Sequence, residues 1–319
     1  MSDTTEPLPL DQLLERHRTE LTGYCYRMLG SFAEAEDAVQ EAMVRAWRGH
    51  SGFEGRAGLR SWLYRIATNV CLDALDGRSR RARPMDLAGP STVATAALVE
   101  LPDATWIGPA PDRRVLSETG DPADLAAQRD SVRLAFVALL QRLAPRQRAV
   151  LILREVLGWR AAEVADLLGS TVPAVNSALQ RARAVLATGP APPQPLTGPE
   201  RELLARYLTA FEQYDMAALT ALLHQDAVLS MPPYRLWLRG AADIRAWMLG
   251  PGEECRGSRL LPVDANASPA FGQYRRGPDG GHRPWSLQVL ELSGGRITGL
   301  TCFLDTPALF PAFDLPDRP

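Results

Sequence analysis

Residues 172–186 carry side chains that can hydrogen-bond to bases and phosphates. Amide, hydroxyl and guanidinium groups are the donors and acceptors with which proteins contact base edges and the DNA backbone. The members of this set on one predicted helix are Asn176, Ser177, Gln180, Arg181 and Arg183. The chemistry that they indicate is non-covalent recognition of DNA.

These side chains need a second helix, packed at a fixed angle, to position them. Apolar residues recur at helical spacing in three consecutive segments between residues 143 and 186. Ala165 supplies the small residue, and Gly169 the tolerance of positive φ, that a helix-turn-helix requires, while Pro173 suits the first turn of the last helix. We predict that the DNA-facing set comprises Arg146, Arg148, Ser170, Thr171, Asn176, Ser177, Gln180, Arg181 and Arg183. Arg146 and Arg148 are the candidates for phosphate contacts, and Ser170 or Thr171 can also cap the last helix. An amphipathic hairpin with a solvated arginine face is the alternative.

Composition restricts the functional classes. All 35 basic residues are arginine and 37 residues are acidic, so the net charge is −2 and any DNA-binding surface must be local. The four cysteines form no C-x-x-C and no zinc-finger spacing, so we expect no metal, no cofactor and a reducing compartment. The amino terminus lacks a signal sequence, and no apolar run reaches the length of a membrane span. We therefore expect a soluble cytoplasmic protein without a membrane partner.

Residues 10–76 show three helical patterns, and two of these helices carry distinct side-chain sets. Acidic and amide groups follow one side of the second helix, with methionine beside them: Glu36, Asp37, Gln40, Glu41 and Met43. An acidic helix face is usually solvated surface, so on its own it identifies no partner.

The third helix places aromatic rings among arginines. Trp62 and Tyr64 lie close in sequence to Arg56, Arg60 and Arg65. Such interleaving suits single-stranded or partly melted DNA, where bases stack on rings and guanidiniums meet phosphates. A buried Trp62 with solvated arginines is the competing interpretation.

Three motifs follow one another along the chain: EAEDAVQEAMVRAWR, LRSWLYRIATNVCLDAL and LAPRQRAVLILREVLGWRAAEVADLLGSTVPAVNSALQRARAVL. Together they resemble regions 2 and 4 of the extracytoplasmic-function-type sigma factors of bacterial RNA polymerase. The resemblance implies that core polymerase binds Glu36, Asp37, Gln40, Glu41 and Met43. It implies that the minus-10 promoter element, with one base flipped out of the opening duplex, binds Phe53, Arg56, Arg60, Ser61, Trp62, Arg65 and Asn69. The helix-turn-helix would then bind the minus-35 element.

Residues after 187 differ in composition and in pattern. The Pro-rich segment 188–199 ends the helix, and helices then precede strands, with Gly294 and Gly295 in a hairpin turn. This order resembles the SnoaL-like cone of the nuclear-transport-factor-2 (NTF2) type, whose pocket or core would hold Trp237, Trp247, Tyr274 and Trp285, with Phe271 and Phe303.

The predicted fold is therefore multidomain. Two all-α domains, a region 2 helical bundle and a region 4 helix-turn-helix, precede a C-terminal α+β NTF2-like cone. The boundaries that we predict are 10–80 for region 2, 81–121 for an irregular linker, 122–187 for region 4, 188–199 for the second linker and 200–319 for the cone and its tail.

We expect no catalysis. His224, Asp226 and His282 are the candidate bases of the cone, but each has an ordinary structural explanation. The predicted function is that of an alternative sigma factor, whose cone regulates it in cis and whose tail packs either on a sigma region or on the cone. A one-component helix-turn-helix regulator with a ligand-sensing cone is the alternative, and a ligand or a separate anti-sigma protein stays open as a partner.

Overall fold

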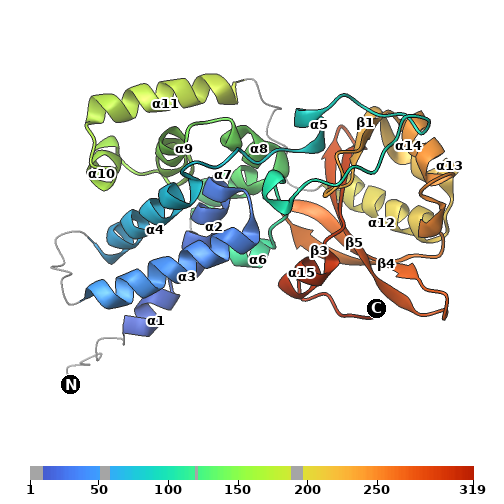
Figure 1. The fold of residues 1–319 in the computed structure, drawn as a ribbon, viewed down its shortest axis with the longest axis horizontal. Coiled ribbons are helices and arrows are strands. Elements are labelled where there is room, and N and C mark those ends of the chain that lie inside the picture. The colour runs from blue at the N-terminus through green and yellow to red at the C-terminus, as the bar shows by residue number, and fades with distance from the viewer. Residues whose placement is uncertain (1–9, 51–57, 119–120, 188–196) are drawn as a thin grey trace. The chain divides into compact units, whose positions relative to one another are not determined.

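The computed structural model describes residues 10–50, 58–118, 121–187 and 197–319. Contacts divide the chain into two compact units, the first made of residues 1–80 and 112–190, the second of residues 81–111 and 191–319 (Figure 1). Within the described ranges, no helix combines the length and the apolar composition that crossing a membrane requires.

The first unit begins with four helices, α1 (Leu10–Glu15), α2 (Arg18–Leu29), α3 (Phe32–Gly49) and α4 (Leu59–Leu75). Gly30 ends α2 with φ of 74°, and Ser31 caps α3 by accepting a hydrogen bond from the Glu34 amide. The carboxyl-terminal three quarters of α2 are buried, and the Tyr24 hydroxyl of this helix forms a hydrogen bond with the Thr68 hydroxyl of α4, with 2.8 Å between the two oxygens. The helix α2 is therefore the centre of this unit.

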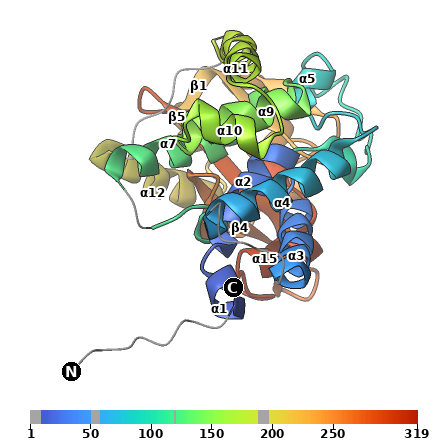
Figure 2. The same ribbon diagram turned by 90° about the vertical axis from the view of Figure 1, so that its left-hand side faces the viewer.

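The rest of the unit is α6 (Asp112–Val115), α7 (Pro122–Val132), α8 (Leu134–Gln141), α9 (Pro145–Leu151), a π-helical turn (Ile152–Val156), α10 (Ala161–Leu167) and α11 (Val172–Leu186). The segment from Pro122 to Gln141 forms two helices, because Arg133 between them adopts an extended ψ of 141°. The turn between α10 and α11 is as predicted: Gly169 has φ of 57°, and the Thr171 hydroxyl accepts from the Ala174 amide. Figures 1 and 2 both place α10 next to α4, and these helices are in contact.

The second unit contains a six-stranded sheet with the strand order β2-β1-β6-β5-β4-β3. Its strands are β1 (Leu223–Ser230), β2 (Trp237–Arg239), β3 (Arg259–Ala265), β4 (Ser268–Arg276), β5 (His282–Ser293) and β6 (Arg296–Phe303). Only β1 and β6 pair in parallel. Gly294 and Gly295 both have positive φ, and they form the two-residue β5–β6 turn that the sequence predicted.

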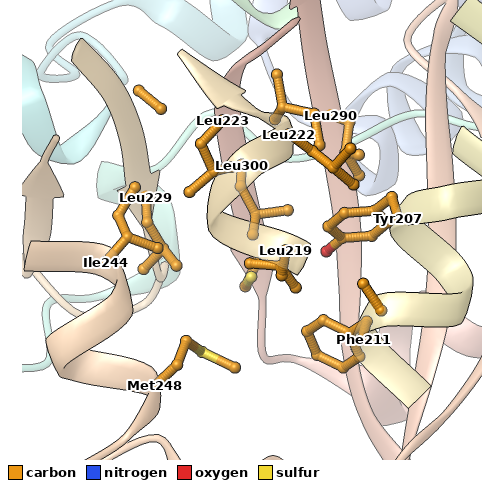
Figure 3. Close-up of a cluster of buried hydrophobic side chains, with 14 of the residues drawn as sticks. Tyr207, Phe211, Leu219, Leu222, Leu223, Leu229, Ile244, Met248, Leu290 and Leu300 are labelled. Carbon is orange, nitrogen blue, oxygen red and sulfur yellow. The ribbon is translucent and has the colours of Figure 1, made fainter. Parts of the chain in front are cut away.

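Three helices supply the other side of this core: α12 (Gly198–Glu212), α13 (Met216–Leu222) and α14 (Ala241–Met248). Figure 3 shows Tyr207 and Phe211 of α12 converging with Leu219 of α13 and with Leu290 and Leu300 of the sheet. A curved mixed sheet covered by helices is the predicted α+β cone. The edge strands β2 and β3 were not predicted.

The segment 81–111 belongs to this second unit and runs along the cone. It contains α5 (Pro84–Leu87) and a 3-10 turn (Asp103–Thr105). The Ser91 amide donates to the Trp237 carbonyl at 2.8 Å, and the Asn266 amide donates to the Ala110 carbonyl at 3.0 Å. The segment predicted as one linker, 81–121, is thus shared between the two units, since residues from 112 onward belong to the first.

The tail after β6 packs on its own cone, through α15 (Thr306–Ala312). The Phe310 ring lies edge-on to Tyr274 with centroids 5.2 Å apart, and the Tyr274 hydroxyl donates to the Pro316 carbonyl at 2.7 Å. Phe313 and Leu315 are buried as well, and Leu315 covers Gly272 of β4. Of the two placements that the sequence left open for this tail, the structure has the one on the cone.

Candidate nucleic-acid and protein interfaces

One face of α11 is buried and the other carries the predicted base-contacting side chains. Val175, Leu179 and Ala182 anchor α11 with at most 5% exposure. The side chains left exposed are Asn176, Ser177, Gln180, Arg181 and Arg183. Arg183 pairs with Glu155 at 2.6 Å, while Ser170 and Thr171 lie exposed at the start of the helix. This face can present donors and acceptors to a DNA groove.

The two arginines predicted to bind phosphate differ in environment. Arg146 is exposed on α9, whereas Arg148 is 2% exposed. The Arg148 guanidinium donates to Gln141 Oε1 at 2.7 Å, to the Leu143 carbonyl at 3.2 Å and to the Met28 carbonyl. Burial lowers the pKa of Arg148 to about 10. The predicted phosphate contact of Arg148 therefore does not fit this conformation, in which the side chain ties α9 to α2.

Arg27 has the same structural role on α2, and no pattern in the sequence predicted this role. Its Nε donates to Ser131 Oγ at 2.7 Å, and Nη2 donates to the Gln128 carbonyl at 2.9 Å. Burial lowers the pKa of Arg27 to about 10 as well. Two buried guanidiniums thus join the region 2 segment of this unit to the region 4 segment.

The predicted single-strand contacts on α4 lie in a cluster with aromatic rings. Arg60 donates to Glu20 Oε2 at 2.8 Å, and its guanidinium carbon lies 5.1 Å from the Tyr64 ring centroid and 5.6 Å from that of Trp159. Arg65 pairs with Asp166 at 2.5 Å. The aromatic partners of Arg60 are therefore Tyr64 and Trp159.

The other residues predicted for this site are dispersed. Ser61 and Trp62 are half-buried, and Asn69 is exposed. Phe53 and Arg56 lie outside the described residues. Trp159 was not predicted, because its sequence position in the other helical segment gives no indication that it meets α4.

The acidic face of α3 is accessible in part. Asp37, Gln40 and Glu41 are exposed, Glu36 pairs with Arg114, and Met43 is only 7% exposed. Beside Met43, a groove of about 340 Å³ lies between α1 and α3, and its lining comprises Asp11, Leu14, Glu15, Arg18, Met43, Val44, Trp47 and Arg48.

Trp47 is the most prominent side chain of this groove. Its side chain is 66% exposed, more than any other large apolar residue in the part of the chain that the structure describes. Exposed aromatic rings beside apolar grooves are typical of protein interfaces. The prediction from sequence did not include Trp47, although the residue stands within the quoted acidic motif.

The cone interior is nearly filled. A cavity of about 40 Å³ is lined by Trp247 and Trp285, together with Phe211 and other apolar side chains. Trp237 and Tyr274 do not line it and are buried elsewhere in this unit: Trp237 Nε1 donates to the Ala88 carbonyl at 2.8 Å, and Tyr274 faces the tail. A volume of this size holds one or two water molecules.

Polar groups at the cavity bond to one another. Tyr207 Oη donates to Gln288 Oε1 at 2.7 Å, and Gln288 Nε2 donates to Gln273 Oε1 at 2.8 Å. Gln273 Oε1 also accepts from Ser286 at 2.8 Å, and its Nε2 donates to Ser258 at 3.0 Å. This buried network is therefore satisfied from within the cone.

The three candidate bases of the cone lie away from this cavity. His224 and Asp226 are 44% and 70% exposed at their side chains, and His282 Nε2 lies 2.9 Å from the Gly257 carbonyl. None of the three lines the cavity. The described residues also contain no group of three or more His, Cys, Asp or Glu side chains arranged to hold a metal ion.

Comparisons with known proteins cover both helical segments and the cone. Family models match as "Sigma-70 region 2" over residues 13–81, "Sigma-70, region 4" over 133–186 and "SnoaL-like domain" over 204–300. The chain is 46% identical over 314 residues to "ECF RNA polymerase sigma factor SigG" of Mycobacterium tuberculosis strain H37Rv. The aligned region covers 95% of this chain and 83% of that protein.

Two further relatives come from the same organism. The chain is 34% identical over 177 residues to "ECF RNA polymerase sigma factor SigM", covering 56% of this chain and 74% of the relative. The crystal structure of the extracytoplasmic function sigma factor SigJ superposes with a TM-score of 0.61 at 20% identity, covering 97% of this chain and all of that one. This last similarity concerns the fold alone.

Proposed function

The chain belongs to the extracytoplasmic-function family of RNA polymerase sigma factors, and we propose that its two helical regions bind the two promoter elements while its cone controls their access. As a member of this family it works with core RNA polymerase and promoter DNA in transcription initiation. A cytoplasmic location follows, because the bacterial polymerase works there. Members of the family are not known as enzymes.

Core polymerase binds along α3 and the groove beside it. The exposed carboxylates and amide of Asp37, Gln40 and Glu41 supply a polar rim, and Trp47 with the groove at Met43 supplies the apolar centre. A buried aromatic anchor within a polar rim is how protein interfaces gain most of their affinity. The two sets lie on one helix, so a single partner can contact both.

The minus-35 element is bound by the exposed face of α11. Arg181 and Gln180 have the side-chain types that bond guanine and adenine edges, and Arg146 on α9 is free to contact a phosphate. Arg183 must exchange Glu155 for DNA if it takes part.

The minus-10 element is bound by α4. Arg60 and Arg65 supply charge, and the Tyr64 ring beside Arg60 supplies a stacking surface, to an unpaired strand. The alternative of a one-component regulator is not favoured, because the segment 13–81 matches sigma region 2, which such a regulator does not need.

The cone regulates the factor in cis by holding the segment that joins the two regions. The observation that carries this proposal is the set of hydrogen bonds that join residues 88–111 to the two edges of the sheet, at Trp237 of β2 and beyond Ala265 of β3. The resemblance to extracytoplasmic-function sigma factors implies that this segment threads the RNA-exit path of the polymerase. Cone and polymerase would therefore compete for it. The filled cavity and the exposed histidine and aspartate support a cone without catalysis.

The test compares the full chain with a chain ending at Gly198 and with Trp237→Phe, which removes the donor to Ala88 but keeps an aromatic ring. Affinity for core polymerase and promoter-specific transcription are measured for all three. We expect both variants to bind polymerase more tightly than the full chain. Unchanged binding and transcription in both would refute control in cis.

A further inference from the structure

The DNA-contacting arginines of α4 have partners within the first unit. Arg65 donates from Nη2 to Asp166 of α10 at 2.5 Å, and Arg60 lies over the ring of Trp159, which precedes α10. Tyr64, between them on α4, has its ring centroid 5.1 Å from that of Trp159. Both partners come from the helix-turn-helix segment.

These partners have the chemistry of an unpaired DNA strand. A carboxylate accepts hydrogen bonds from a guanidinium in the same way as a phosphate oxygen. An indole presents a flat π-face to a guanidinium, as an unstacked base does. Asp166 and Trp159 therefore offer one anionic group to Arg65 and one flat ring to Arg60 on the same helix.

We propose that Asp166 and Trp159 mimic single-stranded DNA on α4, so that the two promoter-binding regions block each other until DNA or polymerase separates them. This inference rests on the proposed function of α4 as the minus-10 reader. It assigns the helix-turn-helix segment a second role, as a competitive ligand of region 2. Binding of a DNA strand to α4 and packing of Asp166 and Trp159 against α4 then exclude one another.

The contact has features of a reversible one. The Asp166 side chain is 76% exposed and that of Arg65 is 43% exposed, so water screens their attraction. Trp159 is 6% exposed, and its Nε1 has no hydrogen-bond acceptor among the described residues. A buried donor without an acceptor costs free energy. Trp159 is therefore held against α4 less strongly than its packing alone would hold it. The mimic therefore holds α4 weakly enough for DNA to displace it.

The test measures how tightly the full chain binds a fluorescein-labelled pool of 20-nucleotide single-stranded DNA, by anisotropy at fixed low salt. Asp166→Asn removes the charge that competes with phosphate, at an exposed position where folding does not depend on it. The matched control is Asp124→Asn, which makes the same change of charge at an exposed site on α7. We expect Asp166→Asn to tighten binding about two- to fivefold, from the range of exposed ion pairs, and Asp124→Asn to leave it nearly unchanged.

Amide hydrogen exchange gives the second readout. Saturating DNA should speed exchange in residues 159–167 of the wild-type chain, because displaced Trp159 and Asp166 lose their contacts. Equal affinities for Asp166→Asn and Asp124→Asn, or exchange unaffected by DNA, would overturn the mimic.

Arg65→Ala separates this failure from that of the proposed function. If Arg65→Ala weakens DNA binding while Asp166→Asn does not tighten it, α4 binds DNA and only the mimic is wrong. If Arg65→Ala leaves DNA affinity unchanged both alone and in combination with Asp166→Asn, the assignment of α4 to DNA binding and the mimic are both wrong.

Discussion

Replacing Arg148 by methionine tests whether this arginine is structural. The side chain is 2% exposed and makes four hydrogen bonds, to Met28, Leu143 and both side-chain and main-chain oxygens of Gln141. Each bond from a charged donor contributes about 1.5–3 kcal/mol. Burial lowers the Arg148 pKa to about 10, which corresponds to a desolvation cost of about 3 kcal/mol. Because the four bonds together outweigh this cost, we expect the free energy of unfolding to fall by at least about 3 kcal/mol.

Urea unfolding of the first unit, followed by circular dichroism, measures this loss. Arg146→Met is the matched control, because Arg146 is exposed on the same helix, and its stability should change by less than about 0.5 kcal/mol. The lowered pKa also predicts a sign for pH dependence. Since Arg148 keeps its proton to a higher pH in the unfolded chain than in the folded chain, its deprotonation in the folded chain adds stability as pH rises above about 10. Equal stability of the two variants would refute the structural role.

Three other substitutions have defined outcomes. Arg181→Ala should weaken binding to minus-35 duplex DNA by about 1–3 kcal/mol at matched salt, and unaltered binding would remove Arg181 from the contact set. Trp47→Ala should weaken binding to core polymerase by about 2 kcal/mol. It should not lower the melting temperature, because the Trp47 side chain is 66% exposed. Titration with labelled polymerase measures the affinity, and an unchanged affinity would show that Trp47 is not part of the interface. Phe310→Ala should destabilise the cone by about 3–5 kcal/mol in thermal unfolding, and a stable variant would show that the tail is dispensable.

Local signals in the sequence were sufficient for several elements. The turn of the helix-turn-helix was predictable because Gly169 tolerates positive φ and Thr171 caps the next helix. The β5–β6 hairpin was predictable from Gly294 and Gly295 for the same conformational reason. Residues close in sequence determine these features, so no knowledge of tertiary packing was needed.

Features set by distant contacts could not be predicted. Arg148 looks like any surface arginine until Met28, far away in the sequence, supplies its acceptor. Trp237 likewise resembles a pocket residue until Ala88 accepts its indole hydrogen. The break at Arg133 has no glycine or proline to mark it. For Trp159, only the tertiary fold brings its ring to α4.

The most direct test of the account is transcription with purified core polymerase and fragments of the organism's genome, followed by mapping of transcript 5′ ends. The account predicts that adding the full chain produces new starts that share two sequence elements upstream, and that Arg181→Ala and Arg65→Ala each reduce them. Absence of new starts, with the chain binding DNA equally well in the absence of polymerase, would contradict it and favour a one-component regulator.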